Sequence, residues 1–160
     1  MSDTYQWRRK FIELVEGVFR ELGFSPPAMT HDAEVPLAME LEVDGTVFEV
    51  VHSSTERPEE ILVECHFGRA PGDGTAAVLA RLLQVNLSLA RAHEPAFGAD
   101  HVSNDVIYAF HEPLDETTAP ELMEIMKQTA VQAKAWQASY FFDGEDGPAT
   151  PAGPRFETLA

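Results

Sequence analysis

The chain has 160 residues, which is enough for one domain with a substantial core that needs no disulfide or metal for stability. Apolar residues make up 44% and charged residues 24% of the sequence, proportions that exclude a wholly disordered chain and a membrane protein. The 27 acidic residues outnumber the 11 lysines and arginines, and the formal net charge is -16. Because such a field repels polyanions, we expect neither nucleic acid nor an anionic membrane surface as a partner.

Cysteine usage and the N-terminal segment both favour the cytoplasm. Cys65 is the only cysteine, so no intramolecular disulfide can form, and its apolar strand context predicts a core thiol. Residues 1–10 lack the apolar core of a signal peptide, and no apolar run approaches membrane-spanning length. We therefore expect a cytoplasmic protein.

The first predicted element is a helix that Asp3 or Thr4 can cap and that Gly23 can end. Its apolar residues recur at helical spacing: Trp7, Phe11, Val15, Val18 and Leu22. The basic run in residues 7–10 is expected to be a solvated helix face. Ser25-Pro26-Pro27 then opens a loop that runs to about Glu34, because proline cannot donate a backbone hydrogen bond.

Three strands follow this loop. Leu37, Met39, Leu41 and Val43 alternate with more polar residues, which is the period of a half-buried strand. Asp44-Gly45 is a signal for a two-residue hairpin turn, so residues 47–52 are predicted to return as the partner strand. A third strand places alternate apolar residues of 61–67 on one face. The three strands are expected to form an antiparallel meander.

The second half of the chain predicts a helix over residues 76–91, strands over 96–101 and 105–111, and a last helix that ends near Tyr140. Thr75 or Asp73 can cap the first of these helices, and Thr118 with Glu121 forms a capping box for the second. The order α-β-β-β-α-β-β-α describes an α+β domain over residues 1–142 with an antiparallel twisted sheet. Residues 143–160 are rich in Gly and Pro and are predicted to be a flexible tail.

No motif in the sequence indicates catalysis. The stretch 68–74 is rich in glycine but lacks the Gly-Lys-Ser/Thr ending of a phosphate loop, and the six histidines do not have the spacing of a metal site. We therefore expect no cofactor, no metal and no enzymatic activity, and a function in binding another polypeptide. An enzyme whose site is assembled from distant residues is the alternative.

The helix predicted over residues 76–91 carries apolar side chains over about 200° of its circumference, more than a helix needs to cover one sheet. Either its own domain encloses it, or part of it packs on another chain, and we predict a homodimer. Asn86 lies near the middle of the apolar arc. Its amide can fix the register of an interface, or it can make a local cap or backbone contact.

The run Leu82-Leu83-Gln84-Val85-Asn86, followed by Phe97-Gly98-Ala99-Asp100, Ile107-Tyr108-Ala109-Phe110 and Pro113-Leu114-Asp115, resembles class I type III secretion chaperones, the Tir chaperone (CesT-like) family. The resemblance covers residues 5–140. It implies a small, acidic, dimeric cytoplasmic chaperone that holds the N-terminal segment of a secreted effector in an extended, secretion-competent form. A YbjN-like dimeric structural or regulatory domain of the same fold, without a secreted client, is the alternative.

The resemblance also implies two sets of contact residues. The second helix and the fourth strand would form the dimer interface, which implicates Leu79, Leu82, Leu83, Asn86 and Phe97. The client would lie near the first helix and the sheet, with Leu37, Met39, Leu41 and Phe11 as candidates, and it could add a strand to an open edge. Core packing is the alternative role of the three β-strand residues.

Overall fold

The computed structural model describes residues 2–90 and 95–142. Its elements are α1 (Ser2–Glu21), β1 (Leu37–Val43), β2 (Thr46–His52), β3 (Glu60–Arg69), α2 (Thr75–Ala90), β4 (Ala96–Ala99), β5 (Asp105–Pro113) and α3 (Ala119–Ser139). This order confirms the α+β prediction. The predicted helix end at Arg91 and the predicted tail over residues 143–160 lie outside the described residues.

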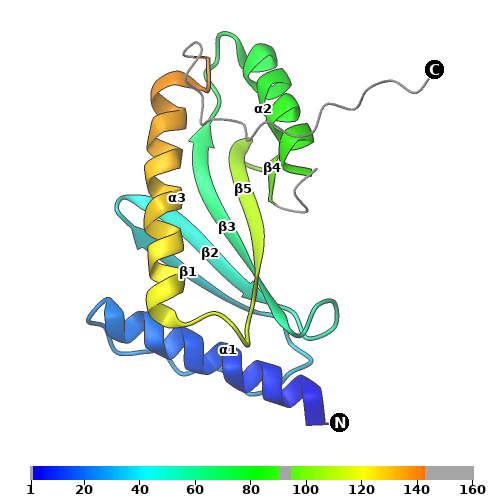
Figure 1. The fold of residues 1–160 in the computed structure, drawn as a ribbon, viewed down its shortest axis with the longest axis vertical. Helices are drawn as coiled ribbons and strands as arrows, with labels where there is room; N and C mark the ends of the chain where they lie inside the picture. The colour runs from blue at the N-terminus through cyan, green and yellow to red at the C-terminus, as the bar shows by residue number, and fades with distance from the viewer. Residues whose placement is uncertain (1, 91–94, 143–160) are drawn as a thin grey trace, which may run out of the picture.

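The five strands form one antiparallel sheet in the order β1-β2-β3-β5-β4, so β1 and β4 are its edges (Figure 1). The hairpin between β1 and β2 turns at Asp44 and Gly45, whose φ angles are 50° and 77°. Positive φ at both residues matches the twist of the flanking strands, which is why Asp-Gly favours this turn. The predicted meander of β1, β2 and β3 is confirmed.

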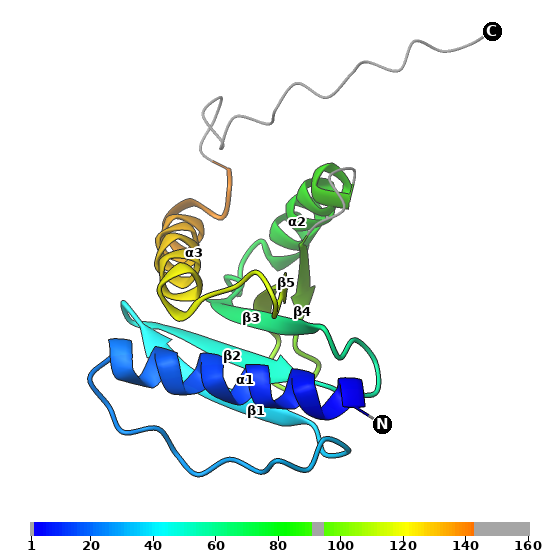
Figure 2. The ribbon, with the colours of Figure 1, turned by 60° about the horizontal axis from the view of Figure 1, so that its bottom comes forward.

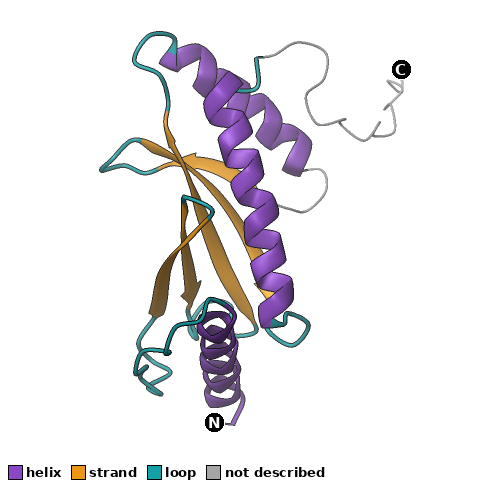
Figure 3. Ribbon diagram, turned by 90° about the vertical axis from the view of Figure 1, so that its left-hand side faces the viewer, coloured by secondary structure: helices purple, strands orange, loops and turns teal. Residues whose placement is uncertain are grey.

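All three helices lie on one side of the sheet (Figure 3). Burial alternates strictly along β2 and β3, so that every second side chain enters the core and the next one lies on the opposite face. Buried residues of α1, α2 and α3 belong to the same hydrophobic cluster as the inward-facing strand residues. Among the described elements, none covers the other face of the sheet.

Helix α3 supplies the centre of the core. Trp136 is fully buried and its ring lies 5.9 Å from that of Phe67 on β3. The N-terminal end of α3 passes close to α1 (Figures 1 and 2), and a Cβ atom on Gly17 would lie only 2.7 Å from the Cβ of Ala119. Glycine at this point therefore permits the close approach of the two helices.

Side-chain hydrogen bonds set two of the element boundaries. The carboxylate of Glu121 accepts hydrogen bonds from the backbone N–H and the hydroxyl of Thr118, at 2.9 and 2.7 Å, which confirms the predicted start of α3. Strand β4 ends at Ala99, two residues earlier than predicted. The reason is the turn that follows, in which the Asp100 carboxylate accepts from the N–H groups of Val102 and Ser103 at 2.9 and 2.7 Å.

Arg8 is fully buried, contrary to the expectation that residues 7–10 form a solvated face. Its Nε–H donates to Nδ1 of His52 at 3.3 Å, and Nη2 donates to the carbonyl of Val35 at 2.6 Å. Because Nδ1 accepts, Nε2 of His52 carries the proton and donates to the carbonyl of Pro58 at 2.9 Å. Burial lowers the pKa of His52, the charge of Arg8 acts in the same direction, and the bond to Pro58 opposes both.

We predict a pH-dependent stability that depends on His52. Because its pKa is lower in the folded chain than the ordinary value of 6.5, the stabilising contribution is complete above about pH 6.5 and is lost as the pH falls toward the folded-state pKa. His52→Gln keeps an acceptor for Arg8 and a donor for Pro58 but does not titrate. Urea unfolding at pH 7.5 and pH 5.5 should show a smaller loss of stability for the variant. Equal losses in both proteins would contradict this role.

Candidate functional site

Helix α2 is buried on one side only. Val78 and Leu82 are 1% and 4% exposed and face the core. Leu79, Leu83 and Leu87, spaced four residues apart on another face, are 38%, 68% and 61% exposed. We call these three residues the α2 leucine row. The described part of the chain therefore does not enclose the helix, and its wide apolar arc consists of a packed face and a face that no described residue covers.

The predicted dimer residues fall into different environments. Leu79 and Leu83 belong to the α2 leucine row, whereas Leu82 is a core residue because it faces the sheet. Phe97 on β4 is half-buried and packs against Phe67, with ring centroids 5.1 Å apart. Leu87 was not among the predicted residues, although its spacing from Leu83 would have placed it in the same row.

Asn86 makes a local backbone contact, one of the two roles considered from sequence. Its Nδ2 donates to the carbonyl of Phe97 at 2.8 Å, and its Oδ1 accepts from the N–H of the same residue at 2.7 Å. Because β4 is an edge strand, this side chain takes the place of a neighbouring strand at Phe97. The amide therefore joins α2 to the sheet and closes part of the β4 edge.

The predicted client-binding residues are also divided by burial. Phe11 is fully buried and stacks on His52 at 5.2 Å, and Met39 is 8% exposed. Both side chains belong to the core, because the apolar faces of α1 and β1 are turned toward each other and toward α3. Leu37 and Leu41 are half-buried and pack at the margin of the core.

Strand β1 is the other edge of the sheet. Within the described part of the chain, β2 is its only hydrogen-bonded neighbour. The side chain of Val35, two residues before the strand, is 48% exposed. That of Tyr5, in the first turns of α1, is 56% exposed. The hydrogen bond from Arg8 to the Val35 carbonyl holds these two segments together. We call strand β1 with Tyr5 and Val35 the β1 edge surface.

Sequence periodicity did not identify Tyr5 or Val35 as surface residues of interest. Their exposure depends on how the loop before β1 contacts α1. That contact is made by Arg8, which is buried although the sequence pattern predicted a solvated side chain. The half-buried Leu37 and Leu41 were identified because alternation within a strand is visible in the sequence.

The described residues contain no cluster of three or more His, Cys, Asp or Glu residues placed to hold a metal ion. Burial raises the pKa of the Cys65 thiol to about 12, so it is protonated at neutral pH and is a poor nucleophile. None of the helices in residues 2–90 and 95–142 combines the length and apolar character of a membrane span.

We predict that Asn86→Ala loosens the β4 edge. Loss of both hydrogen bonds to Phe97 should lower the free energy of unfolding by about 1–2 kcal/mol and accelerate amide hydrogen exchange at Phe97. Ser88→Ala is the matched control, because the hydroxyl of Ser88 donates to the carbonyl of Gln84 in its own helix. Unchanged exchange at Phe97 in the Asn86 variant would refute the role assigned to this amide.

The sequence is similar to that of a known protein family, and the fold is similar to those of solved structures. The sequence model of the Tir chaperone protein (CesT) family matches residues 13–137. No curated protein matches the sequence. Similar solved structures include a chain of the ExsC-ExsE complex, with 18% identity, a TM-score of 0.60, and coverage of 86% of this chain and 96% of that one.

Two further structures have the same fold. A chain of the HopA1-SchA chaperone-effector complex has 19% identity and a TM-score of 0.56, and the match covers 83% of this chain and 97% of that one. A chain of the complex between the Yersinia pestis type III secretion chaperone SycH and a fragment of YscM2 has 14% identity and a TM-score of 0.55, with 78% and 98% covered. With the family match over most of its length, the chain belongs to the Tir chaperone protein (CesT) family.

Proposed function

We propose that this protein is a non-catalytic cytoplasmic chaperone of a type III secretion system that binds the N-terminal segment of an effector in extended form. Family membership supports the chaperone role, and the solved structures of the same fold include chaperone-effector complexes. The observation that carries the extended form of the client is that β1, an edge strand with no second hydrogen-bonded strand among the described residues, closely follows the exposed Val35.

An extended client fits such an edge for two physical reasons. Backbone hydrogen bonds to an edge strand do not depend on the client's side chains, so they provide affinity that tolerates different sequences. Apolar client residues at alternate positions can then pack near Tyr5 and Val35 and beside the half-buried Leu37 and Leu41. A client held in this way is kept from folding on its own.

We propose that the α2 leucine row forms a homodimer interface. Each leucine that is fully buried contributes about 1.5–3 kcal/mol, and a two-fold axis would set the row of one copy against the same row of the other. Charge also supports this choice. The net charge of -16 makes two copies repel each other, but α2 contains no acidic residue, so contact along this helix sets no carboxylates of α2 against one another.

The alternative without a secreted client is a dimeric structural or regulatory domain of the same fold. It shares the α2 interface but not the use of the β1 edge surface. Capture of an effector would distinguish the two functions, and the two tests below separate the two surfaces.

Leu83→Glu is expected to give a folded monomer, because Leu83 is 68% exposed and the new charges would face each other across the interface. Light scattering at tens of micromolar should report half the mass of the unmodified protein. Val131→Glu on α3 is the control, since its exposure of 66% is nearly the same. A Leu83→Glu protein that remains a dimer would assign the interface to another surface.

Val35→Glu is expected to reduce client capture about tenfold while the dimer persists, because a carboxylate beside β1 must be desolvated when an apolar segment packs there. The measurement is co-purification of tagged protein from its native host, with the bound chain quantified by mass spectrometry. Val131→Glu again serves as the control. If both variants capture the same amount of client, the β1 edge surface is not the binding site.

A further inference from the structure

The proposed function gives no role to the sheet face opposite the helices. It is formed by the strand residues that alternate with the core, and none of the described helices packs on it (Figure 3). We call it the open sheet face. Its residues include Glu40 and Glu42 of β1, Val47, Glu49 and Val51 of β2, Leu62, Glu64 and His66 of β3, and Ile107, Ala109 and His111 of β5.

Three glutamates form a row across this face. Glu40 is paired with Glu49 in the register of β1 and β2, and Glu49 is paired with Glu64 in the register of β2 and β3. Side chains that are directly opposite on neighbouring strands lie close together, and like charges in such pairs destabilise a sheet. A solvated sheet face needs polar residues, but it does not need three equal charges in line.

No cation of the described chain neutralises this row. The salt bridges of the sheet lie at its margins, where Arg57 pairs with Glu60 at 2.9 Å and Arg69 pairs with Asp105 at 3.5 Å. Strands β1 and β2 contain neither lysine nor arginine. The described residues therefore do not offset the repulsion among the three carboxylates, and a cationic partner would reduce it.

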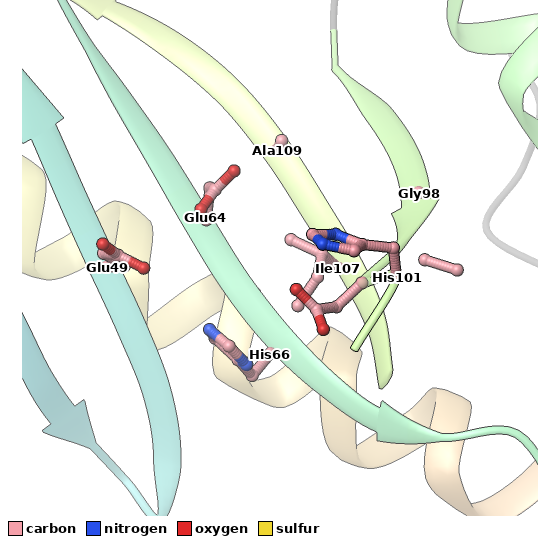
Figure 4. A pocket seen from close by; sticks show the side chains of 9 residues that line it. Glu49, Glu64, His66, Gly98, His101, Ile107 and Ala109 are labelled. Carbon is pink, nitrogen blue, oxygen red and sulfur yellow. The ribbon is translucent and has the colours of Figure 1, made fainter. Parts of the chain in front are cut away.

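A hollow of about 300 Å³ lies beside the row (Figure 4). Glu49, Glu64, His66 and His101 line it with polar side chains, while Ile107 and Ala109 give it an apolar part. This combination suits a long side chain with an apolar stem and a cationic end, because the stem packs on the apolar part and the charge meets the carboxylates.

We propose that the open sheet face binds a basic segment of the client, with an arginine or lysine side chain in the hollow beside Glu49 and Glu64. This site rests on the proposed function in one respect only: the effector client would supply the basic segment. Charge complementarity selects the occupant, since a carboxylate row attracts a cationic chain and repels an acidic one. The described residues contain no metal-binding cluster, which favours a cationic side chain over a metal ion.

A second copy of this protein is a poor occupant. Its only basic run is residues 7–10, in which Arg8 is buried. Of the others, Arg9 pairs with Glu13 at 3.7 Å and Lys10 lies 4.5 Å from the centre of the Trp7 ring. The β1 edge surface and the open sheet face share strand β1, so one client can reach both.

The test is binding of a short fluorescent peptide of alternating arginine and serine, measured by anisotropy at about 50 and about 300 mM salt. The variant is E49Q/E64Q, which removes two charges and keeps the shape of the side chains. Its affinity should fall about tenfold at low salt. The control E21Q/E116Q removes the same net charge from exposed positions off this face and should change affinity less than about twofold.

Three results would overturn the proposal. Equal losses of peptide affinity in the two variants would mean that the net negative charge of the molecule, and not this site, binds the peptide. An unchanged affinity of E49Q/E64Q would mean that the peptide binds elsewhere. Failure of the unmodified protein to bind the arginine peptide would refute the site even if client capture from the native host succeeds, so the two proposals fail separately. The melting temperature of E49Q/E64Q should equal or exceed that of the unmodified protein, since repulsion within the row is removed.

Discussion

Burial on only one side of the sheet is the constraint on which the rest of this structure depends. The core is a single layer between the sheet and three helices, with Trp136 and Phe67 near its centre. Packing within the described residues leaves three surfaces uncovered: the α2 leucine row, the β1 edge surface and the open sheet face.

These surfaces differ in the kind of partner that they suit. The α2 leucine row is apolar and free of acidic residues, which fits a surface that meets its own copy. The β1 edge offers backbone groups, which fit an extended chain of variable sequence. The open sheet face offers carboxylates, which fit a cation. A client bound in the proposed extended form would gain from such different contacts, because a long segment can reach several surfaces.

Features with local causes were predicted from the sequence. The Asp44-Gly45 turn, the Thr118 and Glu121 capping box and the alternation in β3 each depend on residues a few positions apart, and the structure confirms all three. Tertiary relations were not predictable in this way. A helical wheel places Leu82 and Leu83 in one apolar arc, yet one is 4% and the other 68% exposed, because only packing decides which face meets the sheet. The glutamate row likewise depends on strand register, which composition does not reveal.

The contact between Asn86 and Phe97 also limits how copies of this protein can aggregate. A sheet can grow into a fibre only if both of its edges accept a new strand. The side-chain amide occupies the outward backbone groups of Phe97, in the middle of the four-residue strand β4, whereas β1 has no second strand partner among the described residues. Two molecules joined edge to edge through β1 would present only their β4 edges, where Asn86 already occupies Phe97, so addition of a further strand is hindered. Pairing through β1 therefore favours a pair of molecules over a fibre.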